Sequence, residues 1–224
     1  MKAIVAGATG LVGKEMVRLM LQRPEIEMVY ALSRSPQSEN QPGLTWITGK
    51  MPPESLPQAD LLVMALGTTM AKAGSKAAFW KTDVELPLQL EKLAREAGCK
   101  TLLIVSAAGA NPKSLIFYNK AKGTLEEESA KMNFEKITII RPSLLLGKRE
   151  ENRPAEKWAQ KILGPIRNWL PASLRPVKAE EVSGTLLSAE GNERVRIIEN
   201  QDIFSIYSGQ FFLNFGIKGI VKNK

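Results

Sequence analysis

The sequence predicts an α/β fold with a doubly wound parallel sheet. Short apolar runs alternate with amphipathic stretches up to residue 141, and strands that alternate with crossover helices form parallel sheets. The chain has 224 residues, of which 44% are hydrophobic, and this is enough for one sizeable core but too little for a second full-sized domain. We therefore expect a single domain with a small C-terminal cap.

The spacing of apolar residues predicts each element in turn. Strands are expected at 2–6, 26–32, 61–66, 101–105, 136–140 and 194–198, where short apolar runs are bounded by polar residues or turn signals. Helices are expected at 11–21, 84–97, 118–131, 155–163 and 178–189. Five prolines interrupt the pattern between residues 142 and 176, so we place the small cap within residues 143–178.

Three glycines follow the first expected strand directly. Gly7, Gly10 and Gly13 have the spacing of a tight turn that leads from a strand into a helix. Such a turn brings backbone N–H groups against a pyrophosphate, and the helix presents its positive end to the anion. Glycine clusters also form ordinary loops, but the strand and helix on either side favour a dinucleotide site.

The rarest residue types exclude several kinds of site. Histidine is absent, which removes Ser-His-Asp triads, Cys-His pairs and histidine zinc sites, and leaves Tyr, Lys, Asp and Glu for proton transfer. Cys99 is the single cysteine, so we expect no intrachain disulfide and no metal site. The apolar start is interpreted as a strand and not as a signal peptide, and a cytoplasmic location is expected.

The positive charge is unevenly distributed. The formal net charge is +8, and residues 141–178 alone hold nine Lys or Arg against three Asp or Glu. This excess suits an anionic ligand or an acidic surface, although a solvated helix would have the same composition. No basic face with interleaved aromatics is visible, so no nucleic-acid partner is expected.

Three residues have the spacing of a proton-transfer site. Ser106 ends the strand expected at 101–105, and Tyr118 and Lys122 lie at positions i and i+4 of the next helix. This spacing places an ammonium on the same helix face as a phenol. A tyrosine with an ordinary pKa near 10 needs nearby positive charge to exchange a proton near neutral pH. The pattern indicates Ser106, Tyr118 and Lys122 as catalytic residues.

These features together resemble the short-chain dehydrogenase/reductase superfamily. The resemblance narrows to its atypical branch, which includes the Tat-interacting oxidoreductase-like proteins and their bacterial relatives. The matching segments cover roughly residues 1 to 190 and are found at 65–69, 73–74, 98–100, 105–110, 118–123 and 141–154. The resemblance implies a Rossmann-type NAD(P)-binding fold and hydride transfer to or from a small carbonyl or alcohol.

The same resemblance assigns cofactor-binding roles. It implies that Thr9, Gly10, Leu11 and Val12 hold the pyrophosphate, while Leu66, Gly67 and Thr68 line the adenosine side. Lys122 would also contact the nicotinamide ribose. Pro142, Ser143 and Leu144 would border the nicotinamide. The asparagine that completes the proton relay in better-known members has no clear counterpart in this sequence.

Arg34 indicates which nicotinamide cofactor is bound. Sites that prefer NAD usually have Asp or Glu about 20 residues after the glycine turn, at the end of the second strand. Here that strand ends at Ser33-Arg34-Ser35, and an arginine between two hydroxyls suits the 2′-phosphate of NADP. An exposed loop arginine is the alternative. We therefore expect NADP in preference to NAD.

A semialdehyde dehydrogenase is excluded on chemical grounds. Its glycine turn can look similar, but its thiolate must attack an aldehyde. Cys99 precedes a core strand, away from the expected crevice, and the chain has no histidine to act as its base.

The last segment matches no motif. Residues 203–217 carry no charge and contain five aromatic residues, namely Phe204, Tyr207, Phe211, Phe212 and Phe215. We expect an NAD(P)-binding domain over 1–202 and an apolar arm over 203–224 that packs on the domain or joins a homodimer. Fifteen uncharged residues fall short of a membrane span of about 20, and membrane association through the arm is the minority interpretation.

Two functional hypotheses follow from these observations. The first is an NADP-dependent oxidoreductase acting on a small carbonyl or alcohol, and the basic stretch suits an anionic substrate. The second is an NADP-binding regulatory or interaction protein with little or no turnover. Ser106, Tyr118 and Lys122 favour the first hypothesis, while the missing relay asparagine favours the second.

Overall fold

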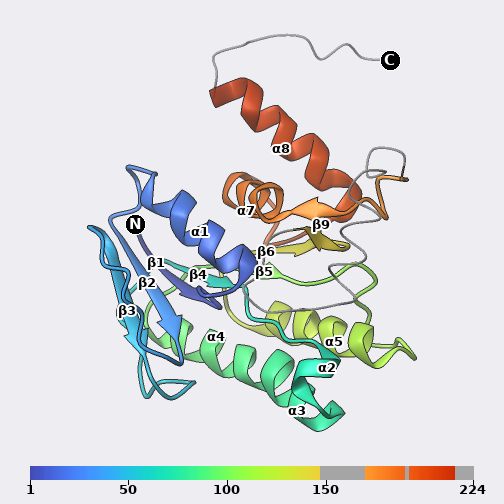
Figure 1. The fold of residues 1–224 in the computed structure, drawn as a ribbon, viewed down its shortest axis with the longest axis horizontal. Helices are drawn as coiled ribbons and strands as arrows, with labels where there is room; N and C mark the ends of the chain where they lie inside the picture. The colour runs from blue at the N-terminus through green and yellow to red at the C-terminus, as the bar shows by residue number, and fades with distance from the viewer. Residues whose placement is uncertain (147–169, 190–191, 215–224) are drawn as a thin grey trace.

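The computed structural model describes residues 1–146, 170–189 and 192–214. Its centre is a parallel sheet of seven strands in the order β3-β2-β1-β4-β5-β6-β9 (Figure 1). The strands are β1 (Lys2–Ala6), β2 (Met28–Ser33), β3 (Leu44–Thr48), β4 (Leu61–Met64), β5 (Thr101–Val105), β6 (Lys136–Arg141) and β9 (Val195–Glu199). The strand order reverses between β1 and β4, and ligands of such sheets bind at the carboxyl ends beside this point.

Helices cover both faces of the sheet (Figure 1). One face carries α1 (Leu11–Leu21), α7 (Ala179–Ser188) and α8 (Asn200–Asn214). The other carries α4 (Leu86–Glu96) and α5 (Phe117–Lys131), preceded by α2 (Met70–Ala73), α3 (Lys76–Trp80) and the π-helical turn η1 (Lys81–Glu85). A separate two-stranded ladder joins β7 (Leu145–Leu146) to β8 (Val177–Lys178). The predicted doubly wound α/β fold is confirmed.

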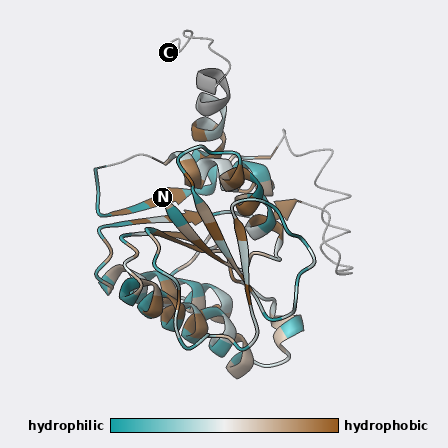
Figure 2. Ribbon diagram, turned by 90° about the vertical axis from the view of Figure 1, so that its left-hand side faces the viewer, coloured by the Kyte–Doolittle hydropathy of each residue, from teal (hydrophilic) through white to brown (hydrophobic). Residues whose placement is uncertain are grey.

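The core consists of two large apolar layers, one on each face of the sheet, and a smaller cluster around Phe79. Alternate strand residues point to opposite faces, so Val5 packs with the α1 side and Ile4 packs with the α4 side. Figure 2 shows the hydrophobic residues concentrated in the strands and on the inner sides of the helices. Buried strands of this kind fix the positions of the loops at their carboxyl ends.

Several predicted bounds are confirmed and others shift. The elements expected at 2–6, 11–21 and 101–105 have those bounds, but the helix expected at 84–97 begins earlier, through α3 and η1. Strand β3 and the short helices α2 and α3 were not predicted. The helix expected at 155–163, and the cap residues between 147 and 169, lie outside the described residues.

The C-terminal run begins inside the domain. Helix α8 starts at Asn200 and crosses the boundary expected at 202/203, and Ile203 is fully buried in the core layer that contains α1 and α7. None of the helices in the described residues is long and apolar enough to span a membrane.

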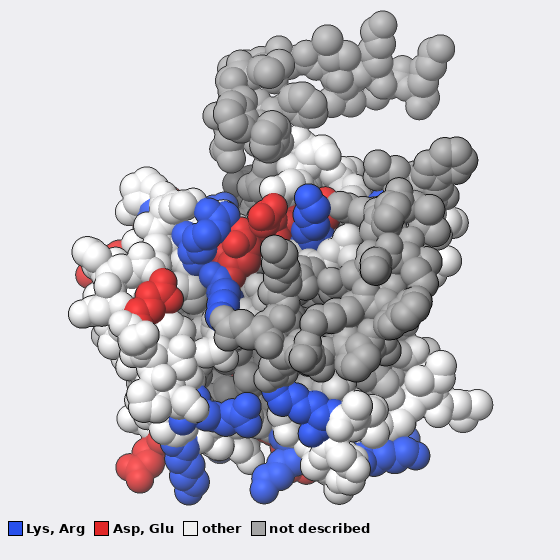
Figure 3. All heavy atoms as spheres, viewed as in Figure 1, with Lys and Arg blue, Asp and Glu red and all other residues white. Residues whose placement is uncertain are grey.

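Charges over α1 and α7 are intermixed. Figure 3 shows acidic and basic side chains side by side in this region, where Arg18 pairs with Glu15 at 2.5 Å on α1. Basic side chains, Lys or Arg, also lie along the lower edge of this face. Most of the basic stretch expected to meet an anion, residues 147–169, lies outside the described part of the chain.

Candidate active site

The glycine turn joins β1 to α1 at the point where the strand order reverses. Gly7 has φ +84°, and a Cβ at this residue would lie 2.5 Å from the carbonyl oxygen of Ala65 in the loop after β4. A Cβ at Gly13 would lie 2.0 Å from the carbonyl oxygen of Gly7. Both positions therefore require glycine, and the turn packs closely against its neighbours.

The N-terminus of α1 is available to an anion. Gly10 is the N-cap residue and offers no side-chain hydrogen bond to the first turn, which also contains no acidic residue. Thr9 and Gly10 are exposed, whereas Val12 is buried and can offer only its backbone. The N–H of Gly10 donates to the carbonyl of Gly7 at 2.9 Å, so the N–H groups of the first helical turn, from Leu11 on, and the helix dipole are what fit a pyrophosphate. A nicotinamide dinucleotide would be held here by Thr9, Gly10 and Leu11.

The loop after β4 lies beside the glycine turn. Ala65 N–H donates to the carbonyl of Ala6 at 2.9 Å, which continues the pairing of β1 with β4. Leu66 packs on the α4-side core layer, and Gly67 is exposed. Thr68 N–H donates at 3.0 Å to a buried carboxylate, that of Asp83 in η1. The loop predicted to line the adenosine is therefore held in place by the buried Asp83 carboxylate.

Lys122 lies beneath this loop and is part of an ion pair. Its Nζ forms an ion pair of 2.9 Å with Asp83 Oδ1, and both side chains are buried. Burial by itself would lower the pKa of Lys122, but the charge of Asp83, helped by Tyr118 and Glu126, holds that pKa above its usual value. Lys122 is therefore a charged group throughout the physiological pH range.

Tyr118 lies one helical turn before Lys122 on α5. Its ring packs on the fully buried Phe79, with centroids 5.7 Å apart. Within the described residues its hydroxyl makes no hydrogen bond. The phenol is thus held by its ring, and its hydroxyl has no partner in the described part of the chain, which suits a proton donor or acceptor.

Ser106 belongs to a buried polar network. Its hydroxyl donates to Glu126 Oε1 on α5, and Arg141 holds the same carboxylate through Nη2 at 2.6 Å and Nε at 3.1 Å. Arg141 also donates to Glu199 at 2.7 Å. A carboxylate held by arginine only accepts hydrogen bonds, so the Ser106 hydroxyl is the donor in this contact. Ser106 is therefore not free to donate to a substrate while this contact is intact.

The segment predicted to border the nicotinamide is fixed by two neighbouring loops. The carbonyl of Pro142 accepts from Ala108 N–H at 2.9 Å, and Leu144 accepts from Val177 N–H at 2.9 Å. Ser143 N–H donates to the buried Asn200 side chain at 2.7 Å, and its hydroxyl donates to the carbonyl of Arg175. Asn200 at the start of α8 therefore helps to shape this edge.

Arg34 is exposed at the end of β2. Ser33 beside it donates to the carbonyl of Ser35 at 2.7 Å and accepts from Gln37, which forms a small hydroxyl-lined turn. The guanidinium is on the same edge of the sheet as the glycine turn, because both follow parallel neighbouring strands.

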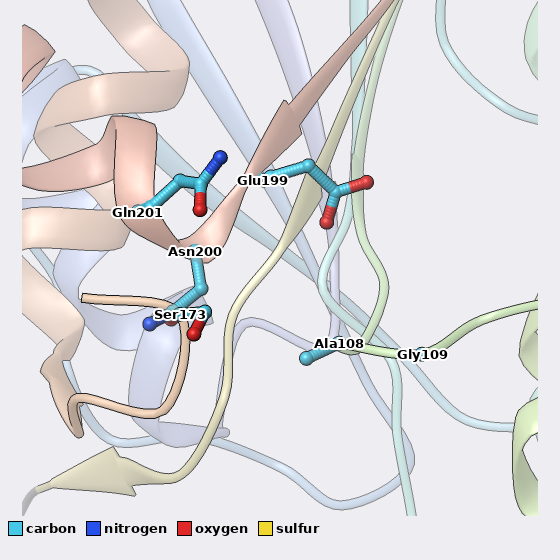
Figure 4. A pocket seen from close by; sticks show the side chains of 6 residues that line it. All are labelled: Ala108, Gly109, Ser173, Glu199, Asn200 and Gln201. Atoms are coloured by element: carbon cyan, nitrogen blue, oxygen red, sulfur yellow. The ribbon is translucent and has the colours of Figure 1, made fainter. Parts of the chain in front are cut away.

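A cavity of about 380 Å³ opens beyond Ser106. Ala108 and Gly109 form one side of it, and the residues at the end of β9 and the start of α8 form the other (Figure 4). The Glu199 carboxylate points into this space, and Ser173 and Gln201 also line it. The cavity lies at the carboxyl ends of β5 and β9, where substrates of such sheets bind.

The structure brings most of the predicted residues to one edge of the sheet. The glycine turn, the 66–68 loop and Lys122 meet there, and Tyr118 lies one turn earlier on the same helix. Residues 142–144 hydrogen-bond to Ala108 and Asn200, which line the cavity. Sequence reasoning missed Asp83, Glu126 and Arg141. A carboxylate in a helical segment is normally expected to face solvent, and so is an arginine at the end of a strand, because the sequence does not display their partners. The π-helical turn that carries Asp83 had no sequence signal that we recognised.

Cys99 is buried, and burial raises the pKa of its thiol to about 12. This agrees with its exclusion as a nucleophile. In the described residues, no three His, Cys, Asp or Glu side chains lie close enough to hold a metal ion.

Comparison with known families identifies the N-terminal half. A family profile described as the NAD binding domain of semialdehyde dehydrogenase matches residues 2–111. The match ends before Tyr118 and concerns the nucleotide-binding part. The chain thus carries an NAD(P)-binding domain, although the thiol chemistry of that enzyme class has no counterpart at Cys99.

Curated relatives match over most of their length. The chain is 33% identical to "Protein FMP52, mitochondrial" of Eremothecium gossypii, with 92% of this chain and 97% of the relative covered. It is 38% identical to the protein of the same name from Emericella nidulans, over 71% of this chain and 73% of the relative. The cytoplasmic location that we expected from the sequence is corrected by these relatives, which are named mitochondrial.

Solved structures share the fold at low identity. The human epimerase family protein SDR39U1 with NADPH has a TM-score of 0.57 and 18% identity, and covers 90% of this chain and 77% of its own. The UDP-glucose 4-epimerase of Thermotoga maritima with UDP-glucose has a TM-score of 0.66 and 17% identity, and covers 98% of this chain and 84% of its own. Both likenesses concern the fold.

Proposed function

Because the chain belongs to the Fmp52 family, we propose that it is an NADP-dependent oxidoreductase of the atypical short-chain dehydrogenase/reductase type. The observation that carries the proposal is the meeting of three groups at one edge of the sheet. The glycine turn packs on Ala65, the next residues of that loop are anchored to Asp83, and Asp83 pairs with Lys122. The finer resemblance to the Tat-interacting oxidoreductase-like proteins is part of this proposal.

Each group of site residues has its own proposed role. Thr9 to Val12 bind the pyrophosphate, Leu66 to Thr68 line the adenosine side, and Pro142 to Leu144 border the nicotinamide. The nicotinamide, when bound, supplies or accepts the hydride. Lys122 holds the ribose, and Tyr118 gives a proton to the carbonyl oxygen during reduction or takes one from the alcohol during oxidation.

The cavity beyond Ser106 is the proposed substrate site. It lies within two or three residues of Ser106 along the chain and is lined by carboxylate, amide and hydroxyl groups. Such groups fit a small polar carbonyl compound or the corresponding alcohol. The excess of Lys and Arg in residues 141–178 favours a substrate that carries negative charge.

The preference for NADP rests on Arg34. Arg34 is exposed between Ser33 and Ser35 at the end of β2, and none of residues 33–37 is a carboxylate. A 2′-phosphate gains charge-assisted hydrogen bonds there, whereas a ribose 2′-hydroxyl lacks its usual acidic partner.

Location and assembly are inferred from other observations. Because the fungal relatives are named mitochondrial, we propose that this protein is also associated with mitochondria. The uncharged run 203–217 supports a homodimer contact, although Ile203 at its start is already buried within the domain.

A second function is favoured by one specific observation. The Ser106 proton is held by Glu126, so the serine cannot stabilise a substrate oxygen as a donor while that contact persists. A protein that binds NADP for regulation or protein interaction, with little turnover, would not need that donor. Turnover measurements decide between the two functions.

The test of the cofactor assignment compares NADPH and NADH by dissociation constant and by thermal shift. We expect wild type to prefer NADPH and Arg34→Asp to lose or reverse that preference, because a ligand of the native state stabilises it by RT ln(1 + [L]/Kd). Lys136→Asp, an exposed change at the opposite edge of the sheet, serves as the charge control. An unchanged NADPH/NADH ratio in Arg34→Asp would remove the assignment.

The test of the enzyme uses Tyr118→Phe and a panel of small aldehydes and ketones with NADPH. We expect binding of NADPH to be nearly unchanged and turnover to disappear, because only the proton donor is deleted. Equal turnover by Tyr118→Phe would contradict the proton-transfer role. Tight binding of NADPH by wild type, with no turnover in any member of the panel, would favour the regulatory function.

A further inference from the structure

Asp83 is a buried carboxylate that no sequence motif predicted. It lies in the π-helical turn η1 and is fully buried. Extra turns of this kind inside a helix frequently occur at functional sites, because they turn a side chain away from the ordinary helical direction. Burial of an ionised carboxylate costs several kcal/mol unless it is paired and hydrogen-bonded. Both conditions are met here by two groups of the candidate active site.

The two oxygens of Asp83 serve different parts of that site. Oδ1 pairs with Lys122 Nζ at 2.9 Å, and Oδ2 accepts the N–H of Thr68 at 3.0 Å. One carboxylate therefore joins the lysine of α5 to the loop that follows β4. If the contact with Lys122 or with Thr68 were lost, the buried Asp83 carboxylate would be only partly satisfied.

Gly67 lies between the Asp83–Lys122 ion pair and solvent. A Cβ at Gly67 would lie 3.8 Å from Asp83 Oδ1 and 3.9 Å from Lys122 Nζ, so the ion pair lies directly beneath this exposed residue. The lysine has three N–H donors, and Asp83 is its one ion-pair partner in the described chain. The remaining donors are close to the surface on which a cofactor ribose would lie.

We propose that Asp83 is a positioning residue for the cofactor, which aims the Lys122 ammonium at the nicotinamide ribose and locks the 66–68 loop in its binding conformation. The inference rests on the proposed function, because it assumes that a nicotinamide dinucleotide occupies this crevice. It extends that function by identifying the group that makes the two halves of the cofactor site a single unit. Asp83 acts through Lys122 and Thr68 and does not itself touch the cofactor.

The charge balance around Lys122 gives the proposal a measurable consequence. The groups that act on the ammonium are Asp83 from η1 and Tyr118 and Glu126 from α5, while burial opposes its charge. Asp83→Asn keeps the shape and one acceptor oxygen, replaces the other oxygen by a donating NH2 group, and removes the negative charge. Desolvation then acts against a weaker attraction, so the pKa of Lys122 should fall below its usual value.

The experiment measures the dissociation constant of NADPH by nucleotide fluorescence between pH 7 and pH 9.5. We expect wild type to bind with little pH dependence. Asp83→Asn should bind roughly tenfold more weakly at pH 7, which is the size of a lost hydrogen bond to a charged group, and should weaken further as the pH rises. Lys122→Met should bind weakly at every pH, because it has no ammonium to titrate.

Two controls separate positioning from general damage. Glu85→Gln removes an exposed carboxylate from the same π-helical turn and should behave as wild type at every pH. Circular dichroism and unfolding in urea establish that Asp83→Asn is folded, and Asp83→Glu tests whether a carboxylate one methylene further away restores the pH-independent binding in part. A purely structural role for Asp83 would not create a new pH dependence.

The outcomes are distinct. Folded Asp83→Asn that binds NADPH as tightly as wild type, with a parallel pH profile, overturns the inference and leaves the proposed function intact. Failure of wild type to bind either NADPH or NADH overturns both. Binding by wild type without turnover of any substrate defeats only the enzymatic part of the proposed function, since the role of Asp83 is measured by binding alone.

Discussion

Glu91 makes the stability of this fold depend on pH near neutrality. It lies on α4, is fully buried, and accepts one hydrogen bond, from Ser129 of α5, at 3.0 Å. Its second carboxylate oxygen has no hydrogen-bond partner in the described chain. Burial raises the pKa of Glu91 from 4.5 to about 8, and the Ser129 hydrogen bond only partly opposes this shift.

The sign of the effect follows from proton binding. A group whose pKa is raised on folding binds more protons in the folded state, so the free energy of unfolding falls as the pH rises. The contribution of protonated Glu91 is complete below pH 4.5 and is lost as the pH passes through about 8. With 1.36 kcal/mol for each pKa unit, roughly 3.5 kcal/mol of stability should be lost between pH 5 and pH 8.

Glu91→Gln isolates this contribution. The amide is close in shape, still accepts from Ser129, and does not titrate, so the variant should lose the part of the pH dependence that Glu91 causes. Urea unfolding of wild type and variant at pH 5, 6, 7 and 8 gives the difference in free energy at each pH. We expect the free energy of unfolding of the variant to rise relative to that of wild type as the pH rises.

A control and a clear refutation accompany this experiment. Glu96→Gln changes an exposed carboxylate on the same helix and should leave the pH profile of wild type unaltered. If the stability curves of wild type and Glu91→Gln run parallel from pH 5 to pH 8, Glu91 is ionised or solvated in the folded protein and the reasoning fails.

The remaining predictions concern the glycine turn and α8. Gly7→Ala should abolish nucleotide binding, measured by titration calorimetry. The added Cβ would lie 2.5 Å from the Ala65 carbonyl, and Gly7 has a left-handed backbone conformation. Ala8→Gly adds no atom to the turn and should still bind the nucleotide. Detectable binding by Gly7→Ala at wild-type affinity would disprove the close packing. Ile203→Ala should lower the free energy of unfolding by about 2–5 kcal/mol because Ile203 is fully buried, while the exposed Ser208→Ala should have little effect. A loss below about 0.5 kcal/mol for Ile203→Ala would show that α8 does not belong to the core.

The central strands were predictable because burial on both faces leaves an unbroken apolar run. Ile4 and Val5, for example, are both fully buried, on opposite faces of β1. Edge strand β3 lacks that signal. Only Leu44 of its five residues is buried, so its sequence resembles an ordinary loop between two turns. Pairing with β2 on one side, which the sequence does not display, makes it a strand.

The candidate site shows the same division between local and tertiary signals. The glycine turn and the Tyr118–Lys122 spacing are local, because close backbone approach and a shared helix face leave marks in adjacent residues. The partners of Lys122 and Ser106 are not local. Asp83 and Glu126 are carboxylates on helices, and only the packing of η1 and α5 reveals that they are buried against a lysine and a serine. The sequence therefore indicates the candidate reactive groups, and the structure adds the groups that hold them in place.

Helix α5 is the frame on which the site is assembled. Tyr118, Lys122 and Glu126 are spaced four residues apart along its inner face, and each is tied to a different element: Tyr118 packs on Phe79 of α3, Lys122 pairs with Asp83 of η1, and Glu126 bonds Ser106 after β5 and Arg141 of β6. Buried ion pairs contribute little net stability, because desolvation offsets most of their attraction. The buried Lys122–Asp83 pair and the part-buried Arg141–Glu126 pair on one helix face are therefore poorly explained by stability alone. Their geometry fixes the rotation and depth of α5 against the sheet, and this places the phenol and the ammonium at the edge where the glycine turn lies.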